Sequence, residues 1–156
     1  MKIIDSFLEK EKADSMHSEL VEKFQLDQYN SINCYDSNKD FSRILDHKHI
    51  SLNLFKNKKP YQLIINSFQK YCRCMGPHSL SKSIFMTLLL SPKDFQGGDL
   101  FFPHEEWTPR SPTLGSCDKF EAKHNRLIVG SSKSQRLMSQ IFDSTGPLIY
   151  ITLDIE

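Results

Sequence analysis

A strand–turn–strand pattern in the second half of the chain limits the possible fold more than any other feature. Residues Ile84–Leu90 form a short, nearly continuous apolar run, and Gly97-Gly98 is followed by a second run, Asp99–Phe102, that ends at Pro103. Apolar runs of this length between polar residues predict buried strands. Adjacent glycines predict a sharp turn, because neither carries a Cβ that would clash with the backbone. The pattern therefore predicts an antiparallel sheet in this half of the chain.

The first half contains two stretches with helical periodicity. In residues 8–24 the side chains at helical spacing are Ala13, Met16, Leu20, Val21 and Phe24. In residues 60–75 they are Ile64, Phe68, Tyr71 and Met75, with Pro60 where a first-turn proline is tolerated. Gly76-Pro77 then stops the pattern, because glycine accepts the left-handed cap conformation and proline cannot continue the helical ladder. Each pattern predicts a helix with one buried face.

Further apolar segments at residues 126–129 and 148–153 predict two more strands. Helices followed by strands predict an α+β fold, with an antiparallel sheet or sandwich backed by N-terminal helices. Residues 107–118 are expected to form one long irregular loop. Residues 29–55 have no clear period beyond a possible short strand at 31–35, and their role is not readable.

Length and composition narrow the class of protein. The 156 residues, 38% apolar and 25% charged, fit a single globular domain spanning residues 1–156. A formal charge of +1 gives no field that would attract nucleic acid. The charged N-terminal residues contain no secretory signal, and no apolar run approaches the ~20 residues that span a bilayer. We expect an intracellular, soluble protein that is not secreted, binds no membrane and keeps its four cysteines reduced.

The segment Thr87–Leu100, with the sequence TLLLSPKDFQGGDL, resembles the strand–turn–strand of prolyl 4-hydroxylase-like oxygenases, which use Fe(II) and 2-oxoglutarate. Residues 7–24 are similar to the first helix of that family. Lys123–Ser132 resembles the strand before its second metal-binding histidine, and Gly146–Leu153 resembles its closing strand. The resemblance covers most of the chain in the right order. It implies a double-stranded β-helix (jelly roll) with N-terminal supporting helices.

The chemistry of this family requires two histidines and one carboxylate around iron, and a basic residue on the last strand that binds 2-oxoglutarate. The resemblance places the first ligand pair, His-x-Asp, at His78-Ser79-Leu80, where leucine cannot bind iron. It places the second histidine a few residues after Ser131-Ser132, where Arg136 is nearest, and a guanidinium is not a metal ligand. The basic residue would fall near Pro147 or Leu148, which are uncharged. All three requirements fail.

These losses favour a degenerate dioxygenase-fold protein, with no catalytic residues and no cofactor, that acts by binding another protein. Poxvirus host-interaction proteins with a prolyl-hydroxylase-like part are degenerate in this way. The candidate partner contacts are Trp107, Phe102 and Arg136.

Two alternatives stay open. One is an active dioxygenase that hydroxylates a protein side chain with Fe(II) and 2-oxoglutarate. Its candidate metal ligands are His78, His104 and His124, with Asp99 or Glu106 as the carboxylate. The other is a non-catalytic jelly roll that binds a small metabolite.

Three short patterns have plainer structural interpretations. His47-Lys48-His49 resembles a cupin metal pair, but no glutamate follows within residues 51–55. Cys72 and Cys74 with His78 resemble half of a zinc site that lacks its second pair. Lys56–Lys59 is a short basic cluster of the kind that usually solvates a loop.

Overall fold

The computed structural model describes residues 1–24, 34–35, 60–68, 75–79, 84–108, 110, 115–131 and 135–155. Within these residues the chain forms one helix, α1 (Lys10–Phe24), and is otherwise mostly β-sheet. The strands are β1 (Lys2–Ile4), β2 (Cys34–Tyr35), β3 (Pro60–Phe68), β4 (Met75–Ser79), β5 (Ile84–Leu90), β6 (Phe95–Gly97), β7 (Leu100–Pro103), β8 (Cys117–Phe120), β9 (Arg126–Ser131), β10 (Gln135–Met138), β11 (Ile141–Ser144) and β12 (Leu148–Ile155).

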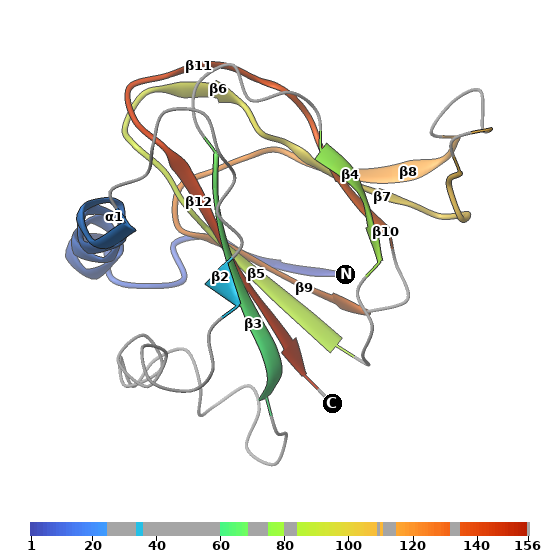
Figure 1. Ribbon diagram of the computed structural model, residues 1–156, viewed down its shortest axis with the longest axis horizontal. Helices are drawn as coiled ribbons and strands as arrows, with labels where there is room; N and C mark the ends of the chain where they lie inside the picture. Colours follow the sequence, from blue (N-terminus) through green and yellow to red (C-terminus); the bar gives the residue numbers. More distant parts are fainter. Residues whose placement is uncertain are drawn as a thin grey trace.

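Two larger sheets face each other, and a two-stranded sheet of β11 and β6 lies beside them (Figure 1). The six-stranded sheet has the order β1-β9-β5-β12-β3-β2, and the four-stranded sheet has the order β4-β10-β7-β8. Every pairing is antiparallel. Along the chain, β3, β4, β5 and β7 alternate between the two larger sheets, and β8, β9, β10 and β12 alternate again. Segments far apart in sequence are therefore interleaved in space.

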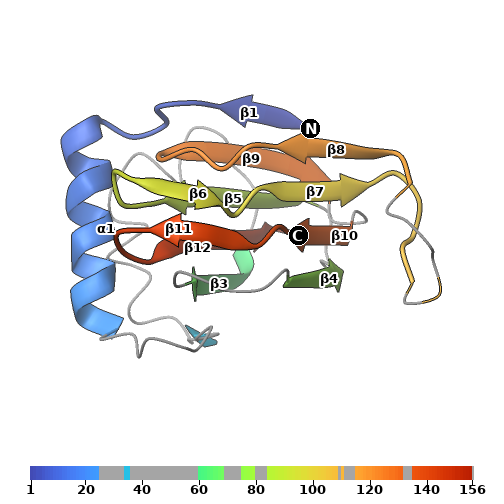
Figure 2. The same ribbon diagram turned by 90° about the horizontal axis from the view of Figure 1, so that it is seen from above.

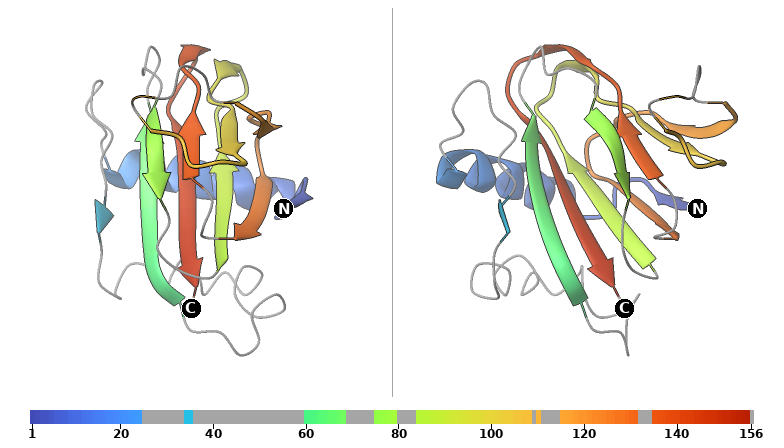
Figure 3. Two further views of the ribbon diagram at one scale, coloured as in Figure 1. Left: turned by 90° about the vertical axis from the view of Figure 1, so that its right-hand side faces the viewer. Right: turned by 45° about the vertical axis from the view of Figure 1, so that its right-hand side comes forward.

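Helix α1 covers the outer face of the six-stranded sheet, as the views in Figures 2 and 3 show. Its buried residues Ala13, Met16 and Leu20 pack on side chains of β5, β9 and β12, which form an outer core. An inner core fills the space between the two larger sheets. Successive side chains of a strand point to opposite faces, so β5 contributes Met86 and Leu88 to the outer core and Phe85 to the inner core. This alternation determines which residues can form an interior site.

The turn at Gly97-Gly98 needs both glycines, as the sequence pattern predicts. Both residues have positive φ, 89° and 78°. A Cβ on Gly97 would lie 2.0 Å from the carbonyl oxygen of Gln140, and one on Gly98 would lie 2.8 Å from Leu148 Cδ2. The tight approach of strand β11 and the inner core to this turn therefore excludes any side chain here.

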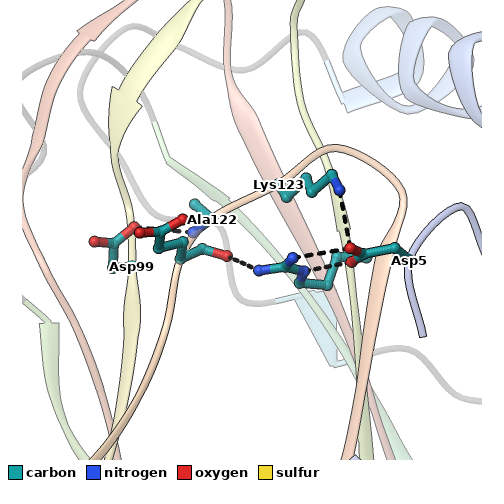
Figure 4. Close-up of polar contacts among 6 residues, drawn as sticks. Asp5, Asp99, Ala122 and Lys123 are labelled. Carbon is teal, nitrogen blue, oxygen red and sulfur yellow. Dashed lines mark hydrogen bonds and ion pairs between the residues drawn. The ribbon is translucent and has the colours of Figure 1, made fainter. Parts of the chain in front are cut away.

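The N-terminal segment is held against the loop before β9. Asn125, which is buried at positive φ, accepts a hydrogen bond from the Leu8 amide (2.9 Å) and donates one to the Leu8 carbonyl oxygen (2.7 Å). Arg126 Nε donates to Asp5 Oδ1 at 2.6 Å, and Lys123 Nζ lies 2.9 Å from Asp5 Oδ2. Figure 4 shows Lys123 directed at Asp5 across this junction. These contacts fix the entry into helix α1.

The helix expected over residues 60–75 is wrong, because residues 60–68 form strand β3 and Met75 begins strand β4. Ile64 and Phe68 are four residues apart, and positions four apart share one face in a strand as well as in a helix. Strand β3 pairs along its whole length with β12, from Pro60 to Phe68, so a partner some eighty residues away decides its conformation. Within the described residues, the expected group of supporting helices is reduced to α1.

Gly76-Pro77 lies inside strand β4 and does not end a helix. Strand β4 is at the edge of its sheet, where a proline leaves no internal ladder bond unmade. The expected strands at residues 84–90, 99–102, 126–129 and 148–153 are confirmed as β5, β7, β9 and β12. In the described residues no helix is long and apolar enough to cross a membrane.

Candidate functional site between the two sheets

A polar group lies inside the otherwise apolar inner core. Arg136 is 8% exposed, and Thr87 and Thr152 are each 1% exposed. Arg136 Nη1 donates to Thr87 Oγ1 at 3.0 Å and to Thr152 Oγ1 at 2.8 Å. The two hydroxyl oxygens are 3.1 Å apart, because Thr87 and Thr152 are directly opposite in the β5–β12 ladder. Arg136 is on β10 of the four-stranded sheet, so these bonds connect the two larger sheets.

Tyr150 is a second buried polar residue on this inner face. Its hydroxyl donates to the carbonyl oxygen of Gly98, and the side chain is 2% exposed. Burial raises the pKa of Tyr150, and the positive charge of Arg136 opposes that rise. The phenol therefore stays protonated and acts as a hydrogen-bond donor.

A small cavity lies beside these residues, with room for about one water molecule. Its lining includes Thr87 and Tyr150 of the six-stranded sheet and Leu100 and Phe120 of the four-stranded sheet. Glu121, Ala122 and Arg126 line its remaining side. At this place the inner space is packed with side chains.

His78, the expected first metal ligand, is in strand β4. In the ladder, its backbone is directly opposite Arg136. The structure thus pairs His78 with Arg136, the residue nearest to the expected second histidine.

The other two candidate ligands, His104 and His124, have separate partners. His104 is exposed after β7 and bonds to Ser116 Oγ (2.8 Å, from Nδ1) and Asp118 Oδ1 (3.1 Å, from Nε2). His124 precedes β9. Its Nδ1 accepts from the Ser91 amide at 3.0 Å, and its Nε2 is 3.0 Å from Asp14 Oδ1. Among the described residues, no three side chains of His, Cys, Asp or Glu are grouped as a metal site.

The two candidate carboxylates are likewise elsewhere. Asp99 Oδ1 accepts from the Ala122 amide at 2.9 Å, and Oδ2 is 3.0 Å from Lys119 Nζ. Figure 4 shows Asp99 beside Ala122. Glu106 is exposed in the loop after β7. The structure therefore does not assemble the rearranged iron site that the active-enzyme alternative requires from these residues.

The three expected partner contacts differ in exposure. Phe102 is 1% exposed in the inner core, stacked on Phe85 with ring centroids 5.4 Å apart. Arg136 is buried as well. Because neither side chain reaches the surface, only half-buried Trp107 can present itself to a partner. The side-chain amide of Gln135 bonds to both polar groups of the Trp107 backbone. It accepts from the Trp107 amide at 2.6 Å and donates to the Trp107 carbonyl oxygen at 3.0 Å.

Several sequence patterns fall outside the described residues: His47-Lys48-His49, Cys72 and Cys74, Lys56–Lys59 and Leu80. Of the expected loop at residues 107–118, the last two residues begin strand β8.

Thr87, Thr152 and Tyr150 are interior polar residues that were not expected from the sequence. Thr87 is the single polar residue of β5, and Tyr150 and Thr152 alternate with apolar residues in β12, so this pattern of interruption was the available signal. It could not show that Thr87 and Thr152 face each other, because the register of β5 on β12 joins residues 65 positions apart.

No family model matches the sequence, and no curated protein matches it. Solved structures do match. A viral collagen prolyl hydroxylase of Paramecium Bursaria Chlorella virus-1 superposes with a TM-score of 0.65 at 15% identity, covering 99% of this chain and 94% of that one. A prolyl-4-hydroxylase of Pseudomonas putida superposes with a TM-score of 0.66 at 12% identity, covering 99% of this chain and 91% of that one. A prolyl hydroxylase of Trichoplax adhaerens, solved with a peptide of hypoxia inducible factor, superposes with a TM-score of 0.58 at 11% identity. The match covers 99% of this chain and 82% of that one. The chain therefore has the fold of the prolyl hydroxylase-like 2-oxoglutarate oxygenases.

Proposed function

We propose that this protein is a double-stranded β-helix that keeps the oxygenase fold without its chemistry and acts by binding another protein. The alternation of strands between two facing sheets supports the jelly-roll assignment. A fold alone does not determine an activity, so the proposal depends on the residues between the sheets.

The observation that carries the proposal is the apolar packing of the described residues between the two sheets. Leu148, near the position that the resemblance assigns to a basic residue for 2-oxoglutarate, is fully buried among apolar side chains. The cavity beside Thr87 and Tyr150 holds about one water molecule, and a dicarboxylate is several times larger. A buried carboxylate also needs a charge or hydrogen bonds that an apolar leucine cannot supply. This packing equally disfavours the metabolite-binding alternative.

The donor set does not fit iron either. Fe(II) in such enzymes is bound by imidazole nitrogens and a carboxylate oxygen. At position 136 the chain has a guanidinium, which offers N–H donors and no lone pair to a metal. Leu80 stands where the carboxylate would be. No reaction step through iron is therefore derived for this chain.

Trp107 supports the protein-binding part of the proposal. Tryptophan is enriched among the residues that contribute most to protein interfaces. The Trp107 backbone accepts one hydrogen bond from the Gln135 side chain and donates another to it, which lowers the entropy lost when a partner orders the segment.

The catalytic part is tested by anaerobic loading with Fe(II), followed by oxygen, ascorbate and 2-oxoglutarate, with succinate measured by mass spectrometry. The Pseudomonas putida prolyl-4-hydroxylase is a suitable positive control. We expect no succinate above a protein-free blank. Turnover of several equivalents per chain would contradict the proposal.

The binding part is tested by cross-linking the full chain to its partner in the cells that express it, with Trp107→Ala compared to Phe142→Ala. Phe142 is a matched control because it is an aromatic residue, 59% exposed, on β11. We expect Trp107→Ala to lose the cross-linked partner and Phe142→Ala to keep it. Retention of the same partner by both variants would contradict the assignment of Trp107.

A further inference from the structure

The buried guanidinium of Arg136 needs a physical explanation. Removing a charge from water is costly unless hydrogen bonds or other charges compensate it. Thr87 and Thr152 provide two acceptors at 3.0 and 2.8 Å, and both are 1% exposed. An apolar side chain at position 136 would avoid the cost. The arginine therefore provides something that an apolar residue cannot.

The arrangement suggests what that is. Arg136 lies on β10, and its acceptors lie on the central strands β5 and β12 of the opposite sheet. The bonds thus link the two sheets near the middle of the β5–β12 ladder, where Thr87 is opposite Thr152. His78 on the neighbouring strand β4 is directly across from Arg136. The resemblance places one iron histidine at His78 and the other near Arg136, and these two residues face each other on β4 and β10.

We infer that Arg136 is a built-in cation that takes the place of a metal ion. It joins the two sheets through Thr87 and Thr152, so the interior is complete without a divalent ion. The inference rests on the proposed function and deepens it, because it assigns a role to the residue that replaces an iron ligand.

The first test is a double-mutant cycle on thermal unfolding. Arg136→Met removes the charge at similar length, and Thr87→Val with Thr152→Val removes both hydroxyls with little change of shape. We expect Arg136→Met to lower the melting temperature by roughly 6 °C. In the background with both valines, Arg136→Met should lower the melting temperature by less than half as much, because the hydrogen bonds from Arg136 to the threonines are already absent. Equal losses in both backgrounds would overturn the inference.

Arg136→Lys is the reserve variant if Arg136→Met does not fold. Lysine keeps the charge but has a single ammonium in place of the planar fork. The same cycle is then measured with it, and the same criterion applies: a loss that shrinks in the double-valine background supports the link, and an unchanged loss refutes it.

The second test concerns the metal position. We expect the melting temperature of the unmodified protein to be the same in chelator and in Mn(II). Arg136→His should place two histidines across the β4–β10 ladder, so Ni(II) should raise its melting temperature by several degrees more than that of the unmodified protein. His78→Ala in the Arg136→His variant should abolish that rise. No response to Ni(II) in Arg136→His, or a Mn(II) response in the unmodified protein, would count against the inference.

The two claims fail separately. Succinate formation with an intact Arg136–threonine coupling would reject the proposed function and keep the link between the sheets. No succinate, together with an equal loss from Arg136→Met in both backgrounds, would keep the proposed function and reject the link between the sheets.

Discussion

His17 Nε2 lies 2.8 Å from the carbonyl oxygen of Pro147, which ties helix α1 to the turn before strand β12. The side chain is half-buried, and His124 and Asp14 are its titratable neighbours. Burial lowers the pKa of His17, the hydrogen bond to Pro147 opposes this, and the charge of His124 adds to the lowering. Protonation is thus less favourable in the folded state than in the unfolded chain.

This relationship predicts an acid-side loss of stability. A histidine with a lowered folded pKa contributes stability that is present above its unfolded pKa of about 6.5 and is lost as the pH falls through the folded value. His17→Gln, which can still donate to Pro147, should show a smaller loss between pH 7.5 and 5. Urea unfolding at the two pH values measures it. His104→Gln, at an exposed position, is the control and should keep the full loss.

Asn125 should be among the most sensitive positions of the chain. Asn125→Ala removes both hydrogen bonds to Leu8 and places a Cβ-bearing residue without polar compensation at φ 59°, so we expect a cost of about 3 kcal/mol. Asn125→Gly loses the same bonds without the backbone strain and should cost about 1 kcal/mol less. Equal destabilisation by the two variants in urea unfolding would contradict this account of the strain.

Gly98→Ala should destabilise the inner core. The added Cβ would lie 2.8 Å from Leu148 Cδ2 and 2.9 Å from the Tyr150 hydroxyl, at φ 78°. We expect a loss of at least about 3 kcal/mol. Gly146→Ala is the matched control, because its nearest neighbour would be Pro92 Cβ at 3.7 Å, an ordinary contact. A melting temperature for Gly98→Ala close to that of Gly146→Ala would show that the turn can open.

Asp5→Asn tests the ion pairs at the N-terminal junction. Hydrogen bonds from Arg126 and then Lys123 hold the pKa of Asp5 far below its usual range. A lowered carboxyl pKa contributes stability that is present above the unfolded value of about 4 and is lost as the pH falls below it. Because Asp5 is 38% exposed, solvent screening limits the cost of Asp5→Asn to under about 1 kcal/mol at neutral pH.

The effect of Asp5→Asn should shrink in 1 M salt, where exposed charges are screened over about 3 Å. Glu9→Gln is the control, because Glu9 is 74% exposed and pairs only with Lys12 at 3.4 Å among the contacts described. A larger cost for Glu9→Gln than for Asp5→Asn would contradict the assignment of the junction.

Local patterns predicted the elements whose signal lies within the element itself. Helix α1 carries an apolar pattern with the helical period, strand β5 is a nearly continuous apolar run, and both formed where expected. Strand β3 failed because its four-residue spacing fits a helix and a strand equally, and its partner β12 lies far along the chain. Strand β10, with the sequence QRLM, carries almost no apolar pattern of its own. Its alternation of half-buried and buried residues exists only in the folded sheet.

The site was partly readable for the same reason. The sequence placed Arg136 nearest to the missing histidine, because the Lys123–Ser132 segment preceding it could be aligned. It could not place the guanidinium between Thr87 and Thr152, because those bonds depend on the packing of two sheets. It also assigned Phe102 to the surface as readily as to the core, since an aromatic residue before a loop fits either.

The central claim is that this oxygenase fold holds no iron between its sheets. The most direct measurement is an anaerobic titration of the purified, chelator-treated protein with Mn(II) as an Fe(II) substitute, followed by electron paramagnetic resonance, with and without 2-oxoglutarate. We predict no tight Mn(II) site with or without 2-oxoglutarate, so the signal of free Mn(II) should rise from the first aliquot. Stoichiometric loss of that signal, strengthened by 2-oxoglutarate and abolished by His78→Ala, would contradict the account.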